Sequence, residues 1–180
     1  MFRISVLSLM LVFFVGLTVC VFAQVDKTRE LVAALDKTKY KKKEKKGFTV
    51  EVYVDIKNEP VVKKNPSEYS GVYTDPDGFT RLDLRVSADG SAEGTGYEGE
   101  NASHGQRYTL KNARVIGALL TATKVIENGD SRKFEAVFVN RTTNVGTNPT
   151  TDVTTVNSYG LGYIEYGSGW SNRVFLELMK

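Results

Sequence analysis

The sequence predicts an all-β fold, an antiparallel meander that closes into an up-and-down β-barrel of about eight strands. Three observations indicate this fold. Apolar and polar residues alternate with a period of two from residue 48 onward, and four turn signals place a Gly after Asp, Asn or Ser. Small residues also recur opposite large aliphatic ones, as they do inside small closed barrels. The alternative fold for the same strands is a two-sheet sandwich.

The N-terminus has the features of a secretory signal peptide. A basic residue precedes the apolar run 4–22, and Val21-Phe22-Ala23 fits the small-residue cleavage pattern. Cleavage would remove residues 1–23 and make the protein secreted or periplasmic. Two alternatives remain: an uncleaved membrane anchor, because the run is long enough to span a bilayer, and a lipoprotein in which Cys20 is lipidated.

A lysine-rich segment, residues 24–46, follows the signal. It carries nine Lys/Arg against four Asp/Glu, whereas residues 47–180 carry fourteen against seventeen. Apolar residues at three- and four-residue spacing predict a short basic helix over 27–42, with Asp26 as its cap. This helical stalk is either a solvated spacer or a contact to an anionic membrane surface through Lys37–Lys46.

The third part, residues 47–180, is predicted as the barrel domain. Its candidate strands are 48–57, 69–74, 79–87, 91–98, 106–111, 115–126, 130–140, 157–166 and 170–179. The segments Gly99–Gly105 and Arg141–Val156 are expected to be loops. Both faces of the 115–126/130–140 hairpin are apolar, which predicts that the N-terminal helix or a second subunit covers it.

The turn signals predict the strand register. Each should form a three-residue hairpin loop with Gly in the left-handed conformation; the four are Pro76-Asp77-Gly78, Ala88-Asp89-Gly90, Glu127-Asn128-Gly129 and Gly167-Ser168-Gly169. In this register Leu82 and Leu84 lie opposite Gly96 and Gly94. The same rule places Ala122 opposite Phe134, Lys124 opposite Arg132, Gly162 opposite Val174 and Gly160 opposite Leu176.

The register also predicts two rows on the opposite face. One contains Tyr73, Arg81 and Tyr97, and the other contains Tyr69, Arg85 and Glu93. In the functional interpretation, the two rows form an aromatic and cationic strip that binds a sugar, an anion or an aromatic ligand. In the structural interpretation, they are cross-strand pairs on a solvated face. The candidate ligand-binding residues are therefore Tyr69, Tyr73, Arg81, Arg85, Tyr97 and Trp170.

Composition limits the possible functions. One His and one Cys exclude a disulfide scaffold or a zinc cluster, and a net charge of +3 gives no sign of nucleic-acid binding. No nucleophile–base pair, phosphate loop or metal-spaced cluster is found, so no catalytic residue, metal or cofactor is assigned.

We therefore expect an exported, non-enzymatic barrel domain that binds a small molecule or a cell-envelope component. The first alternative is an envelope-associated structural or protein-interaction domain. The second is a barrel enzyme that uses a buried carboxylate and tyrosine, such as Glu165 with Tyr163.

Overall fold

The computed structural model describes residues 26–45, 48–99, 105–148, 152–167 and 170–179; for residues 38–51, 148, 167 and 170 it describes the backbone alone. Within these residues the fold is all-β, as predicted, with one short helix over residues 26–35. The ten strands and the single 3-10 turn have the following bounds: β1 Lys37–Lys45, β2 Phe48–Pro60, η1 Pro66–Tyr69, β3 Gly71–Thr74, β4 Thr80–Val86, β5 Ser91–Glu98, β6 Gln106–Ile116, β7 Leu119–Ile126, β8 Ser131–Asn148, β9 Asp152–Gly167 and β10 Trp170–Leu178.

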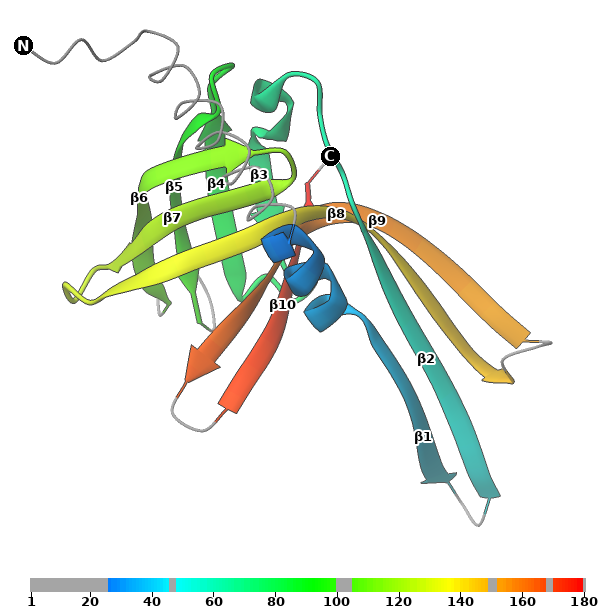
Figure 1. Cartoon of the computed structure of the whole chain (residues 1–180). Helices are drawn as coiled ribbons and strands as arrows, with labels where there is room; N and C mark the ends of the chain where they lie inside the picture. The colour runs from blue at the N-terminus through cyan, green and yellow to red at the C-terminus, as the bar shows by residue number, and fades with distance from the viewer. Residues whose placement is uncertain (1–25, 46–47, 100–104, 149–151, 168–169, 180) are drawn as a thin grey trace, which may run out of the picture.

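Eight of these strands close the predicted antiparallel barrel. The order β8-β7-β6-β5-β4-β3-β10-β9 returns to its start through the pairing of β9 with β8. β8 and β9 continue past the barrel, and β2 pairs with the distal part of β8 while β1 pairs with β2. This four-stranded extension, which we call the arm, projects away from the barrel (Figure 1). It consists of β1, β2, residues 139–148 of β8 and residues 152–159 of β9.

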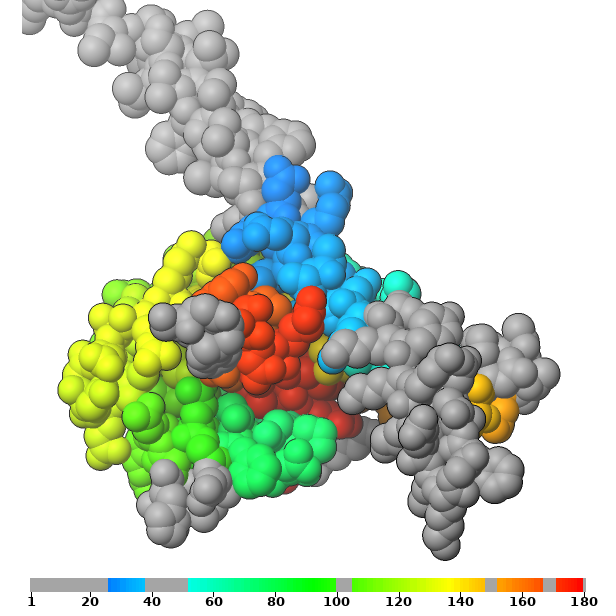
Figure 2. Space-filling model, turned by 90° about the horizontal axis from the view of Figure 1, so that it is seen from below, coloured from blue at the N-terminus to red at the C-terminus, as the bar shows by residue number. Residues whose placement is uncertain are grey.

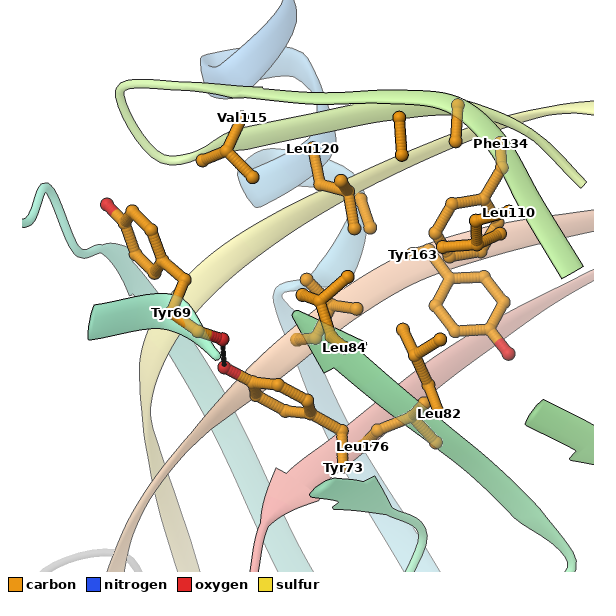
Figure 3. Packing of buried hydrophobic residues seen from close by; sticks show 14 of the residues in the cluster. Tyr69, Tyr73, Leu82, Leu84, Leu110, Val115, Leu120, Phe134, Tyr163 and Leu176 are labelled. Carbon is orange, nitrogen blue, oxygen red and sulfur yellow. Dashed lines mark hydrogen bonds between the residues drawn. The ribbon is translucent and has the colours of Figure 1, made fainter. Parts of the chain in front are cut away.

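Side chains fill the barrel interior. Tyr69 stacks on Phe138 with ring centroids 4.1 Å apart, and Phe134 packs against Tyr163 at 5.0 Å. Figure 3 shows Tyr69, Phe134 and Tyr163 together with leucines of the same core; these residues come from η1 and from several strands. Gly94 and Gly96 face this core, where an added Cβ at Gly94 would lie 2.9 Å from Leu110 Cδ1, so small residues do oppose large ones here.

Two of the four predicted three-residue loops are confirmed. Gly90 and Gly129 have φ of 83° and 94°, and each loop gives the predicted pairing of its flanking strands. In particular, Leu82 lies opposite Gly96 and Leu84 lies opposite Gly94.

The first predicted loop is wrong by one residue. Asp75 N–H donates to the Thr80 carbonyl and Asp75 Oδ1 accepts from Thr80 N–H, so the loop has four residues and includes Phe79. Tyr73 then pairs with Leu82 rather than Arg81. A one-residue change reverses the face of every side chain in the strand, which moves Tyr73 into the core.

The last hairpin is also shifted by one residue. Gly162 pairs with Phe175, and Gly160 pairs with Glu177, instead of Val174 and Leu176. The inward positions are therefore taken by Leu161 and Tyr163, and Gly160 and Gly162 lie on the outer face of the barrel.

The N-terminal helix packs on this outer face, which confirms the predicted cover. Leu31 and Leu35 are buried against Ala118, Leu119, Val137 and Val139. Leu35 sits over Gly162, where an added Cβ would lie 2.5 Å from its Cδ1. Figure 2 shows the helix (blue) seated beside β9 and β10 (orange and red); Arg173 also donates to the Ala34 carbonyl.

A buried polar junction ties the end of this helix to the arm. Asn58 is 5% exposed, and its backbone N–H and side-chain amide both donate to Asp36 Oδ1, at 2.8 and 3.0 Å. Arg141 donates to Asn58 Oδ1 at 3.0 Å and lies over the Phe175 ring. Burial lowers the pKa of Arg141 to about 10.

The predicted lysine-rich helix is wrong beyond residue 35. Residues 37–45 form β1 instead, paired with β2 along their whole length. A helix would set Lys37 against Lys41 and Lys39 against Lys43 at the unfavourable i,i+4 spacing, whereas the hairpin gains a full set of strand pairings.

Two other segment predictions are corrected. The expected loop Arg141–Val156 is mostly strand, because β8 extends to Asn148 and β9 starts at Asp152; its Thr and Val residues favour strands. The predicted strand 115–126 is interrupted by a turn at Gly117, whose φ is 60°, and the chain reverses there between β6 and β7.

The predicted signal peptide, residues 1–23, lies outside the described residues, as do residues 100–104 of the expected loop Gly99–Gly105. Among the described residues, no helix has both the length and the hydrophobicity needed to cross a bilayer.

Candidate functional site

The inward-facing rows of three strands, β5, β7 and β9, become charged at one end of the barrel, which we call the barrel mouth. On β7 the inward positions run Leu120, Ala122 and then Lys124, whose side chain is only 8% exposed. Glu98 ends the inward row of β5, and Glu165 follows Tyr163 on β9. Strand alternation therefore points all three charged groups toward the same space.

Lys124 connects the two carboxylates. Its ammonium forms a hydrogen-bonded ion pair with Glu98 and lies 4.0 Å from Glu165 Oε1. It also sits 4.4 Å from the centre of the Tyr108 ring, a favourable cation–π position. Tyr163 contributes a longer hydroxyl contact of 3.4 Å to Glu98 Oε1.

Burial perturbs the acids of the barrel mouth. It raises the pKa of Glu165, and the negative charge of the neighbouring Glu98 carboxylate raises that pKa further. Burial also raises the pKa of Tyr108 and Tyr163 well above the usual tyrosine range. Both phenols therefore stay protonated at neutral pH, and Glu165 holds its proton to a higher pH than an exposed glutamate does.

A pocket of about 180 Å³ opens beside this cluster. We call it the mouth pocket. Its lining consists of Lys124, Arg132, Lys133, Phe134, Tyr163, Ile164, Glu165 and Tyr166. Three of these side chains are cationic and one is acidic. Tyr166, at the rim, is 72% exposed and can contact a bound molecule.

The candidate residues from the sequence do not form one site. Tyr69 and Tyr73 are buried in the core, and the Tyr73 hydroxyl donates to the Tyr69 carbonyl at 2.6 Å (Figure 3). The Tyr69 hydroxyl accepts from Lys63 N–H and lies 2.8 Å from the carbonyl oxygens of Val61 and Gly117. Both tyrosines therefore have a structural role. Tyr73, on β3, is absent from the first predicted row on the outer face, and Tyr69, in η1, is absent from the second.

The remaining parts of the rows are present on the outer face. Arg81 pairs with Tyr97, as predicted, beside a shallow pocket of about 480 Å³ that also includes Arg107. Arg81 donates to Asp83 at 2.9 Å. Arg85 pairs with Glu93 farther along the same strands. Trp170 opens β10, but its side chain lies outside the described residues.

Sequence reasoning missed the charged cluster, although a signal for it was present. Lys124 occupies an inward position of a confirmed register, opposite Arg132, where an apolar residue is expected. A like-charge pair is unfavourable between strands, but the ion pair of Lys124 with Glu98, two strands away on β5, accounts for this lysine. Glu165 and Tyr163, named as a possible catalytic pair, do lie together at the barrel mouth.

Within the described ranges no three His, Cys, Asp or Glu side chains are placed to hold a metal ion. No protein-family model, curated protein or solved structure matches the chain.

Proposed function

We propose that this chain is an exported, non-enzymatic β-barrel domain that binds a small acidic molecule, or the acidic end group of a cell-envelope component, in the mouth pocket. The observation that carries the proposal is the inward placement of Lys124 and Arg132 at the end of a barrel that is otherwise filled. Burying the charge of Lys124 is costly, and a buried charge next to Glu165, with its raised pKa, favours a functional role for this pocket, at which Arg132 is exposed to solvent.

The size of the pocket favours a small ligand or one terminal group. At about 180 Å³ it falls below the range of roughly 300–1,000 Å³ that is typical of drug-sized ligands. The aromatic core, including Tyr69, Tyr73 and Phe138, fills the space where a lipocalin-like barrel would hold a larger ligand.

The charges favour an anion. Lys124 is offset by Glu98, and Lys133 pairs with Glu135 at 2.7 Å. Arg132 makes no ion pair with any other described side chain, so its guanidinium is available to hold a carboxylate in a bidentate manner. Glu165 is the one acidic group of the lining, and the Lys124 ammonium, 4.0 Å from its Oε1, offsets part of its charge.

The acid pair favours binding over hydrolysis. Glu98 forms an ion pair with Lys124, and Glu165 lies 4.0 Å from the same ammonium, so this shared cation is the partner of both carboxylates. Tyr163, with its raised pKa, is a poor base at neutral pH.

Titration calorimetry with small carboxylates, such as a hexuronic acid and benzoate, against their neutral alcohol or amide analogues tests this proposal. We expect a carboxylate to bind, and Arg132→Gln to weaken it by about 10- to 100-fold, the value of a charged hydrogen bond of about 1.5–3 kcal/mol. Arg114→Gln, on the exposed outer face of β6, is the matched control. Binding of neither anion, or equal loss in both variants, would contradict the proposal.

An envelope-associated interaction domain is the second candidate. The filled interior and the four-stranded arm beyond the barrel favour it, because such an arm offers backbone edges and exposed valines to a macromolecular partner.

A further inference from the structure

In the described part of the chain, the arm has two strand edges that pair with no further strand. β9 pairs with β10 only from Gly160 onward, so residues 152–159 have β8 as their one strand neighbour in the described part of the chain. The outer edge of β1 is the other end of the sheet. Unpaired edges present backbone N–H and C=O groups that can extend a sheet.

The two edges differ in chemistry. β1 has six lysines in nine residues, and lysines on an edge strand oppose pairing with another chain. The free part of β9 reads DVTTVNSY, with Asp152 as its single charge and four consecutive β-branched residues. Val153 and Val156 are 39% and 55% exposed. The β9 edge is therefore chemically suited to strand addition, and the β1 edge is protected.

We infer that the free edge of β9 pairs with the same edge of a second copy of this chain, antiparallel and around a twofold axis. An axis at Thr155 sets Asp152 opposite Ser158 and brings no like charges together. The equivalent pairing of β1 with itself would set Lys39 opposite Lys43, which is unfavourable. The symmetric contact buries both β9 edges and joins the two arms into one continuous sheet.

The alternative contact, β9 of one copy on β1 of the next, is ruled out by the same comparison. It would place the lysines of β1 along the new pairing, and each added copy would leave another free edge. Such head-to-tail contacts build open filaments rather than closed dimers. The twofold arrangement pairs the unprotected edge of β9 and leaves the lysine-rich edge of β1 exposed to solvent.

Light scattering coupled to size-exclusion chromatography of the purified chain, over protein concentrations from about 1 to about 100 µM, tests this inference. We expect a dimer. Val156→Lys, which sets lysines near each other across the axis, should weaken it by about tenfold or more. Val145→Lys is the matched control, since Val145 is 40% exposed and lies one strand further in, on β8.

Single cysteines at Thr154, Thr155 or Val156 in a Cys20→Ser background give an independent reading. Antiparallel neighbours have Cα separations of about 4.5–5.5 Å, within disulfide range, so at least one should form a cross-linked dimer on oxidation. A Val145→Cys variant should not. A monomer at every concentration, equal behaviour of the two lysine variants, or open-ended assemblies would overturn the inference.

Discussion

A single methyl group added at Gly162 should loosen the N-terminal helix from the barrel. The new Cβ would lie 2.5 Å from Leu35 Cδ1 and 3.2 Å from its Cδ2. Leu35 is 1% exposed, so it cannot move aside without giving up its burial. Overpacking of this kind costs about 1–3 kcal/mol, against a gain of about 0.5–1 kcal/mol from replacing Gly in a strand. We expect Gly162→Ala to lower the free energy of unfolding by about 1–2 kcal/mol.

Removing the clashing side chain should reverse the sign of this effect. Leu35→Ala alone should cost about 2–5 kcal/mol, as deletion of a buried leucine does. In that background Gly162→Ala meets no obstacle and should stabilise by about 0.5–1 kcal/mol. A double-mutant cycle by urea denaturation should therefore give an interaction energy of about 1.5–3 kcal/mol. If the two effects simply add, Leu35 does not rest on Gly162 and the helix is not docked as described.

Three further predictions concern charge. Lys124→Met leaves two partly buried glutamates without their cation and should lower the free energy of unfolding by about 3 kcal/mol at neutral pH. This is the low end for a buried pair, because both glutamates keep some exposure. In the same denaturant titration, Lys111→Met, at an exposed position, should change the free energy of unfolding by less than about 0.5 kcal/mol. Because the pKa of Glu165 is raised in the folded state, its contribution to stability is complete below the unfolded pKa and is lost as the pH rises through the folded pKa. Glu165→Gln should therefore flatten the dependence of the free energy of unfolding on pH just above about pH 4.5. An unchanged pH dependence would contradict the raised pKa. If β1 contacts anionic lipid, replacing the six lysines of Lys37–Lys45 with Gln should weaken co-sedimentation with anionic vesicles by an order of magnitude or more at low salt, and no loss would remove a membrane role for this strand.

The fold followed from local chemistry wherever the turn was correctly identified. Gly90 and Gly129 need a left-handed conformation, and this requirement gave the correct register for the β4–β5 hairpin and for the β7–β8 hairpin. The loop after Thr74 contains Phe79 as an extra residue, held by the Asp75 side chain. The turn signal alone does not reveal that hydrogen bond. The prediction therefore used a loop of three residues and placed the Tyr73 side chain on the wrong face of β3.

The site was harder to predict than the fold. Charged residues at inward positions make sense only when their partners are known, and Glu98 reaches Lys124 across strands that are 26 residues apart in sequence. Likewise, Gly160 and Gly162 looked like interior spacers, but both lie on the outer face of the barrel, and Gly162 lies under Leu35 of a helix that is far upstream in sequence. Both arrangements depend on long-range closure of the barrel, which alternation and turn chemistry do not determine.

Residue-resolved NMR during titration with a hexuronic acid tests most directly where this protein recognises a ligand. We expect chemical-shift changes concentrated at the barrel mouth, on Arg132, Tyr163 and Glu165, with the core tyrosine Tyr69 unaffected. Shifts centred in the core, or on the Arg81–Tyr97 pair of the outer face, would contradict recognition at the barrel mouth.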